Sequence, residues 1–165
     1  MNLAAACRWF IRPPERHVRS AYRFRGAARM ADILSGRRVL VVEDEILILL
    51  MIEDILADLG CTTVFTAATV ADALAIIDIQ TLDAAMLDCN LGDSRSDPIA
   101  EALDSRGVPL FFATGYSDLA SRERYAGRLV LNKPFDSAGV EASFKQVLLR
   151  PRDAATKPGR EAPAC

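Results

Sequence analysis

Apolar and polar positions alternate along this chain with two different periods. Short, mostly apolar runs predict strands buried in a sheet, and longer segments with spaced charges predict helices. The strands are expected at Arg37–Glu43, Thr62–Ala67, Leu82–Leu87, Val108–Ala113 and Arg128–Asn132. The helices are expected at Glu45–Leu59, Val70–Asp78, Asp97–Arg106 and Ser137–Leu149. Strands and helices therefore take turns from residue 37 to residue 149.

Three residues mark the ends of the predicted helices. Gly60 follows the first helix, where a glycine often ends a helix. Thr69 precedes the second helix and can cap it, and Pro98 stands at the first turn of the third. These local signals agree with the bounds that the apolar pattern predicts.

The alternation predicts an α/β fold, a doubly wound five-stranded parallel sheet with the flavodoxin-like order 2-1-3-4-5. Only 19 positions separate Thr114 from Lys133, so we expect a reduced or missing fourth helix between the last two strands. A length of 165 residues, with 51% apolar and 25% charged residues, fits one folded domain.

Charge is distributed unevenly along the chain. Residues 1–29 carry a net charge of +6, residues 30–150 one of −9, and residues 151–165 one of +1. We expect a basic leader at 1–29, which is either disordered or precedes a true start at Met30, and a disordered tail at 151–165. An arm that contacts anionic membrane or nucleic acid is the alternative interpretation of the leader. The folded domain is expected at 36–150.

Cysteine and histidine usage limits the chemistry. The four cysteines contain no CxxC pair, and with no secretory signal they indicate free thiols in a reducing, cytoplasmic setting. His17 is the only histidine, which argues against histidine-rich zinc sites and Ser-His or Cys-His catalysis. The apolar run Ile46–Ile52 is too short to span a membrane.

Polar residues stand where four of the predicted strands end. In parallel sheets of this kind, ligands bind at the carboxyl ends of the strands. The residues at these ends are Glu43 and Asp44 after the first strand, Asp88 after the third, Thr114 after the fourth, and Asn132 and Lys133 after the fifth. Crowded carboxylates favour a hard divalent cation, and Mg²⁺ suits a site with few carboxylates and phosphate oxygens. With an ammonium and a hydroxyl nearby, the set predicts a phosphoryl site in which Asp88 is the nucleophile.

At these residues the chain resembles the receiver domain of two-component response regulators. The matching segments stand in the family's order, and the resemblance covers about residues 37–150. They are VLVVEDE (39–45), AAMLDCNL (84–91), FFATGY (111–116) and LNKPF (131–135).

The resemblance implies a role for each site residue. Asp88 would accept a phosphoryl group, Thr114 would hydrogen-bond it, and Lys133 would pair with it. The resemblance also implies a cis peptide bond between Lys133 and Pro134. Mg²⁺ would be bound by Glu43, Asp44, Asp88 and the backbone carbonyl of Asn90.

The implied function is that of a single-domain response regulator that signals by protein–protein contact. Its phosphoryl donor would be a histidine kinase or phosphotransfer protein, and a downstream protein target is expected rather than nucleic acid or membrane. The protein would assist its own phosphorylation and dephosphorylation without being an enzyme. The alternatives are an Asp-nucleophile phosphatase or phosphotransferase, in which Asn90 could not serve as the general acid, and a phosphorylation-independent pseudo-receiver.

The chain departs from the usual receiver pattern at one position and resembles a subgroup of the family at another segment. Most receivers carry an aromatic switch residue three positions before the lysine, where this chain has Val130. The segment FFATGY resembles a subgroup with Phe-Ala-Thr-Gly-Tyr after the fourth strand, which makes Tyr116 a candidate aromatic reporter.

Overall fold

The structure is a computed structural model that describes residues 33–115, 125 and 127–149. Its strands are β1 (Arg38–Val42), β2 (Thr63–Ala67), β3 (Ala84–Asp88), β4 (Asn90–Leu91), β5 (Ser94–Arg95), β6 (Leu110–Thr114) and β7 (Val130–Asn132). The helices in the described part of the chain are α1 (Ile46–Asp58), α2 (Val70–Ile79), α3 (Asp97–Ser105) and α5 (Ser137–Leu149). None of these helices has the length and apolar character needed to cross a membrane.

Five of the strands form one parallel sheet in the order β2-β1-β3-β6-β7. Counted along the chain without the two short strands β4 and β5, this is the order 2-1-3-4-5 that the sequence predicts. The doubly wound fold is therefore confirmed. Its strand order reverses between β1 and β3, and this is the point where parallel sheets of this kind bind ligands.

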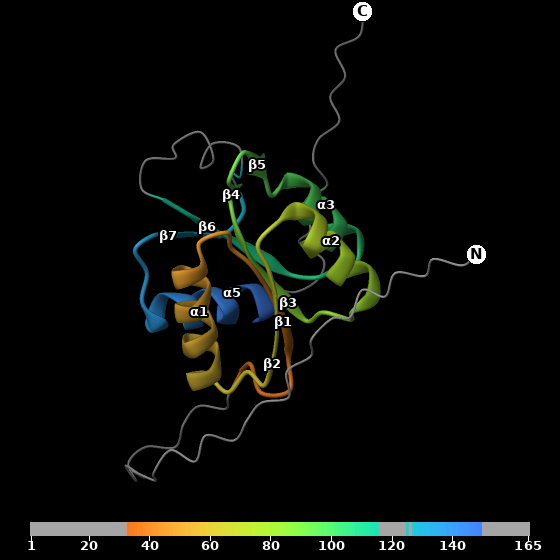
Figure 1. Ribbon diagram of the computed structural model, residues 1–165. Helices are drawn as coiled ribbons and strands as arrows, with labels where there is room; N and C mark the ends of the chain where they lie inside the picture. The colour runs from red at the N-terminus through yellow and green to blue at the C-terminus, as the bar shows by residue number, and fades with distance from the viewer. Residues whose placement is uncertain (1–32, 116–124, 126, 150–165) are drawn as a thin grey trace, which may run out of the picture.

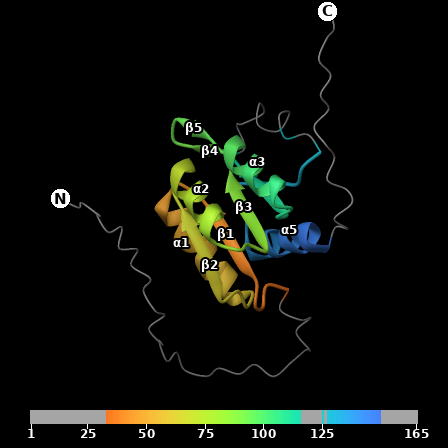
Figure 2. The ribbon, with the colours of Figure 1, turned by 90° about the vertical axis from the view of Figure 1, so that its right-hand side faces the viewer.

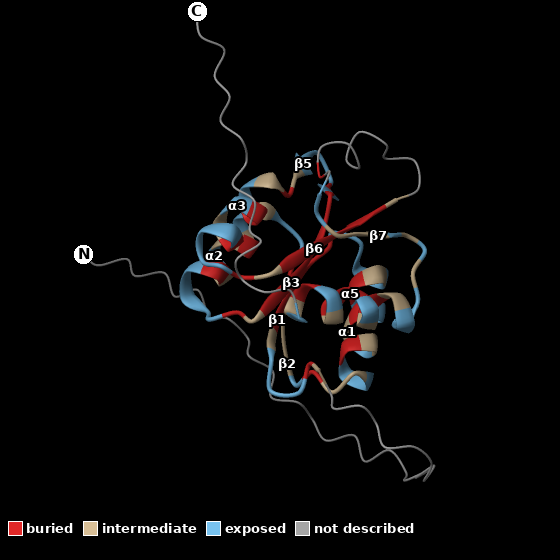
Figure 3. Cartoon of the chain, turned by 180° about the vertical axis from the view of Figure 1, so that it is seen from behind, coloured by how far each residue is buried: buried red, intermediate tan, exposed pale blue. Residues whose placement is uncertain are grey.

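Helices cover both faces of the sheet (Figures 1 and 2). Alternate strand residues point to opposite faces, so each strand contributes to two hydrophobic clusters. One cluster joins β1, β3 and β6 to α2 and α3 through Leu40, Leu87, Phe112, Ile77 and Leu103. The other joins the same strands to α1 and α5 through Val41, Met86, Phe111, Ile52 and Phe144. The central strands are buried throughout and the helices expose their outer faces, as Figure 3 shows.

The helices begin and end within one residue of the predicted bounds, and the predicted end signals act as expected. The backbone N–H of Asp72 donates to the Thr69 hydroxyl, 3.1 Å away, which caps α2. Gly60, just beyond α1, has a φ of 83°, a conformation that glycine adopts without steric cost.

The peptide bond between Lys133 and Pro134 is cis, as the resemblance to receiver domains implies.

The segment after Asp88 differs from the prediction. The sequence pattern predicts no regular element between the strand that ends at Leu87 and the helix that begins at Asp97. The structure has an antiparallel hairpin there, in which β4 and β5 pair Asn90 with Arg95 and Leu91 with Ser94. Gly92, with a φ of 60°, begins its two-residue turn. A Gly-Asp pair between two strands is a known hairpin signal, although strands this short give little apolar pattern to detect.

Several predictions concern residues outside the described part of the chain. They are the leader at 1–29, the tail at 151–165, the reporter role of Tyr116 and most of the segment expected to hold a reduced or missing fourth helix. The other strand bounds shift by one to two residues. For example, β3 includes Asp88, and β7 begins at Val130 rather than at Arg128.

Candidate functional site

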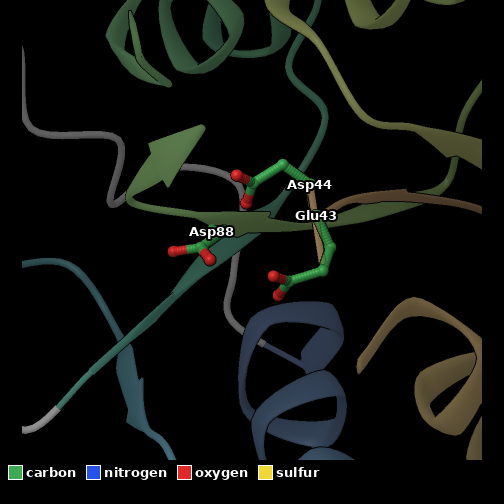
Figure 4. Close-up of side chains that lie close together, drawn as sticks. All are labelled: Glu43, Asp44 and Asp88. Carbon is green, nitrogen blue, oxygen red and sulfur yellow. The ribbon is translucent and has the colours of Figure 1, made fainter. Parts of the chain in front are cut away.

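Three carboxylates lie together at the carboxyl edge of the sheet (Figure 4). Asp88 is the last residue of β3, and Glu43 and Asp44 directly follow the neighbouring strand β1. Each offers an oxygen atom within 4.8 Å of the others. Glu43 and Asp88 are buried, with 1% and 7% of their surface exposed, whereas Asp44 is exposed. Two buried carboxylates and one at the surface thus meet where the strand order reverses.

Lys133 neutralises part of this negative charge. Its ammonium nitrogen lies 2.7 Å from Oε2 of Glu43 and 2.6 Å from Oδ2 of Asp88. The residue follows β7, and its backbone N–H donates to the carbonyl of Thr114 over 2.8 Å. The lysine therefore reaches back across the sheet edge and joins the ends of β1 and β3.

Backbone N–H groups of the hairpin hold two further carboxylate oxygens. The N–H of Asn90 donates to Oδ1 of Asp88 over 3.2 Å. The N–H of Gly92 donates to Oδ2 of Asp44 over 3.0 Å. The hairpin thus fixes two of the three acids, a feature that the sequence pattern did not predict.

Thr114 and Asn90 occupy the positions that the sequence predicts, but their roles stay predictions. Thr114 is fully buried at the end of β6, and its hydroxyl lies 3.4 Å from the carbonyl of Gly115, to which it donates. Asn90 is exposed at the start of β4. All six residues expected at the site therefore lie at or just beyond the carboxyl ends of β1, β3, β6 and β7.

Burial changes the acid–base properties of the site. It raises the pKa of Glu43 from 4.5 to about 7, and the nearby charge of Asp88 adds to the effect, while the hydrogen bond and charge of Lys133 oppose it. For Lys133, burial acts to lower the pKa. Its hydrogen bonds to Asp88 and Glu43 and their negative charges outweigh burial, so the pKa is raised and the ammonium stays charged.

The acidic cluster fits a hard divalent cation. Carboxylate oxygens are the ligands that Mg²⁺ prefers, and one or two carboxylates with water and phosphate oxygens complete its shell. Glu43, Asp44 and Asp88 supply such oxygens on one side of the sheet edge. A bound cation would also favour the ionised form of Glu43, whose pKa is raised mainly by burial.

Comparison with known proteins identifies the family. Residues 39–144 match the response regulator receiver domain, and this is most of the chain. No curated protein matches it. The chain belongs to the response regulator receiver domain family.

Solved structures agree with this assignment. The solution structure of SdrG from Sphingomonas melonis Fr1 is 46% identical, with a TM-score of 0.63; the match covers 71% of this chain and 98% of that one. The beryllofluoride-activated conformation of SdrG from Pseudomonas melonis Fr1 is 47% identical, with a TM-score of 0.60 and coverage of 68% and 96%. The receiver domain of sensor histidine kinase PA1611 from Pseudomonas aeruginosa PAO1, with magnesium in its active site cleft, is 26% identical, with a TM-score of 0.62 and coverage of 69% and 98%.

Proposed function

We propose that this protein is a response regulator that accepts a phosphoryl group on Asp88 from the phosphohistidine of a histidine kinase or phosphotransfer protein. The observation that carries the proposal is the position of Asp88 between the Lys133 ammonium and the two other carboxylates. It acts as a single-domain regulator of the Phe-Ala-Thr-Gly-Tyr subgroup and signals by contact with a protein target. The 46% identity to SdrG over nearly the whole of that chain supports this assignment.

In the proposed reaction, an oxygen of Asp88 attacks the phosphorus atom. An O–P bond forms, the N–P bond of the phosphohistidine breaks, and the electron pair of that bond leaves with the imidazole nitrogen. The product is an acyl phosphate. Asp88 is the acceptor because it is the one acid of the cluster that ends the central strand β3 and contacts Lys133 directly while keeping 7% of its surface accessible.

Lys133 and Thr114 assist by binding the transferred group. The Lys133 ammonium, which now contacts Oδ2 of Asp88, compensates charge on a phosphoryl oxygen attached there. Thr114, whose hydroxyl now donates to the carbonyl of Gly115, would donate to the same group instead. Both residues act on the phosphoryl group, so the protein assists its own modification and is no enzyme with a separate substrate.

We further propose that the reaction requires Mg²⁺, held by Glu43, Asp44, Asp88 and the carbonyl of Asn90. When bound, the cation neutralises charge on the phosphoryl oxygens. The magnesium ion in the active site cleft of the PA1611 receiver domain supports this proposal, as does the cluster of three acids.

The donor protein is proposed to contact α1. This helix starts two residues after Asp44 and exposes a large apolar stripe beside the site, formed by Ile46, Leu47, Leu50 and Met51. The charged residues at positions 45–58 are all acidic, so a matching surface would be apolar with basic residues around it.

Replacing the acceptor tests the proposal. We expect Asp88→Asn to abolish acid-labile labelling by acetyl phosphate in the presence of Mg²⁺, because the amide cannot form the acyl phosphate. Asp93→Asn is the matched control, since Asp93 is an exposed acid in the turn of the same hairpin and should label like the wild type. Labelling that persists in a folded Asp88→Asn variant would place the acceptor elsewhere.

A further inference from the structure

Tyr125 forms a buried contact that the proposed reaction does not explain. Only 6% of its surface is exposed, and its ring stacks on Phe112 of β6 with 3.8 Å between ring centroids and 18° between planes. Its hydroxyl donates to Oδ1 of Asp97, the first residue of α3, over 3.0 Å. Burial raises the pKa of this hydroxyl, so it stays protonated and able to donate. A stacked ring would suffice for packing, whereas the hydrogen bond ties the residue to one particular carboxylate.

Asp97 connects Tyr125 to the hairpin. The second oxygen of Asp97 accepts from Nε of Arg95 over 3.2 Å, and Arg95 also lies 5.9 Å from the centre of the Tyr125 ring. Arg95 belongs to β5 and pairs with Asn90 of β4. The next residue, Ser96, closes the base of the hairpin by donating its N–H and its hydroxyl to the carbonyl of Cys89. The hairpin is thus anchored at the side where Tyr125 lies.

The opposite side of the hairpin holds the acids. Its two N–H groups from Asn90 and Gly92 donate to Asp88 and Asp44, as described above. A two-stranded hairpin this short has no core of its own and is marginal in isolation, so its position depends on what anchors it. A continuous series of contacts therefore runs from the Tyr125 hydroxyl to the carboxylates of the site.

We propose that Tyr125 is a positioning residue of the phosphoacceptor site, which acts through Asp97 and the β4–β5 hairpin to fix the carboxylates of Asp44 and Asp88. The inference rests on the proposed function, because those carboxylates are the proposed Mg²⁺ ligands and phosphoacceptor. Arg128 supports the same arrangement. Its guanidinium pairs with Asp104 near the other end of α3, and its N–H donates to the carbonyl of Tyr125 over 2.9 Å.

The variant Tyr125→Phe separates positioning from packing, because the ring that stacks on Phe112 remains and only the hydroxyl is lost. We expect two changes at the site. Amide hydrogen exchange of Asn90 and Gly92 should become faster in the Mg²⁺-free protein. The dissociation constant for Mg²⁺, measured by titration with Mg²⁺ alone, should rise about 3- to 10-fold, less than the roughly 10- to 100-fold typical when a direct partner of a metal ligand is removed.

Ser143→Ala is the matched control. It also removes one buried hydroxyl, which donates to the carbonyl of Gly139 within α5, and it should change neither quantity. Combining Tyr125→Phe with Asp97→Ala should weaken Mg²⁺ binding no further than Asp97→Ala alone, since both changes break the same hydrogen bond.

Unchanged amide exchange and Mg²⁺ affinity in a folded Tyr125→Phe variant would overturn the inference. So would additive effects of the two substitutions. Failure of the proposed function would be seen in another experiment, because acetyl phosphate would then not label the wild-type chain. The Mg²⁺ titration and the amide exchange measurement do not depend on that labelling, so the two failures can be told apart.

Discussion

At the scale of single residues, the site is a balance of buried charges. The Lys133 ammonium lies within hydrogen-bond distance of two buried carboxylates, those of Glu43 and Asp88, and all three groups have little access to water. Taking such groups out of water costs free energy that their mutual attraction only partly offsets, so stability alone does not explain the cluster. The raised pKa of Glu43 reflects this cost, because burial disfavours the charged carboxylate more than Lys133 stabilises it.

The pKa of Glu43 predicts how stability depends on pH. Between pH 4.5 and about 7 the folded protein holds a proton on Glu43 that the unfolded chain has released, so raising the pH across this window favours unfolding. We expect the free energy of unfolding of the Mg²⁺-free wild type, relative to Glu43→Gln, to fall by about 1 to 3 kcal/mol from pH 5 to pH 7.5. Urea unfolding at several pH values, with a chelator present, measures it.

The glutamine variant isolates the effect because it keeps the shape and an oxygen acceptor for Lys133 but cannot ionise. Saturating Mg²⁺ should reduce the fall, since a cation favours the ionised carboxylate. If the difference in the free energy of unfolding between the wild type and Glu43→Gln stays constant from pH 5 to pH 7.5, the pKa of Glu43 is not raised in the folded protein.

At the scale of elements, α1 has two faces with different tasks. Leu49, Ile52 and Leu56 pack against the sheet, while Leu47 exposes 79% of its surface beside the site. The sequence pattern alone could not separate these faces, because positions 46–52 are all apolar. Packing against the sheet and α5 decides which side of the helix stays in contact with solvent.

We expect Leu47→Gln to slow phosphotransfer from a histidine kinase about tenfold, the effect of losing about 1.4 kcal/mol of binding energy at the centre of an interface. Labelling by acetyl phosphate, which needs no protein contact, should stay unchanged. The kinase is first identified by phosphotransfer profiling, and the rates are then compared at a single kinase concentration.

Ile79→Gln is the control, because Ile79 ends α2 and exposes 72% of its surface. If both variants receive the phosphoryl group from the kinase at the wild-type rate, α1 is not the docking surface. If both are slowed equally, the effect is a general one of surface apolarity.

The elements also show what the sequence could predict. Each strand of the sheet contains a run of mostly apolar residues, which the sequence pattern detects, and the topology brings the strand ends together. The sequence therefore predicts that Glu43, Asp88 and Lys133 meet, as their contacts show. The hairpin was missed because its strands have two residues each and gain their stability from anchoring contacts. The contact of Tyr125 with Asp97, 28 residues apart, has no local signal at all.

At the scale of the whole molecule, the sheet and its two hydrophobic clusters involve residues between Ile33 and Leu148 of the described chain. The site lies within the same limits. Residues 1–29, the expected basic leader, carry a net charge of +6 and lie outside the part of the chain that the structure describes.

A chain that starts at Met30 should therefore fold and be phosphorylated normally. We expect its free energy of unfolding to stay within about 0.5 kcal/mol of the full chain, as for changes outside a core. Its labelling by acetyl phosphate should match that of the full chain. Urea unfolding and labelling of the two chains side by side measure both properties, and a clear loss of either would give the leader a structural role.

The ion pair between Glu43 and Lys133 joins residues 90 positions apart. Glu43 and Asp88 come early enough to pair β1 with β3 before the rest of the chain is in place, but their ammonium partner follows the last strand of the sheet. Bringing residues so far apart together costs loop-closure entropy, which the pairing of the intervening strands offsets. A partly folded chain in which β7 has not joined the sheet would therefore lack the ammonium that the proposed phosphoacceptor site needs.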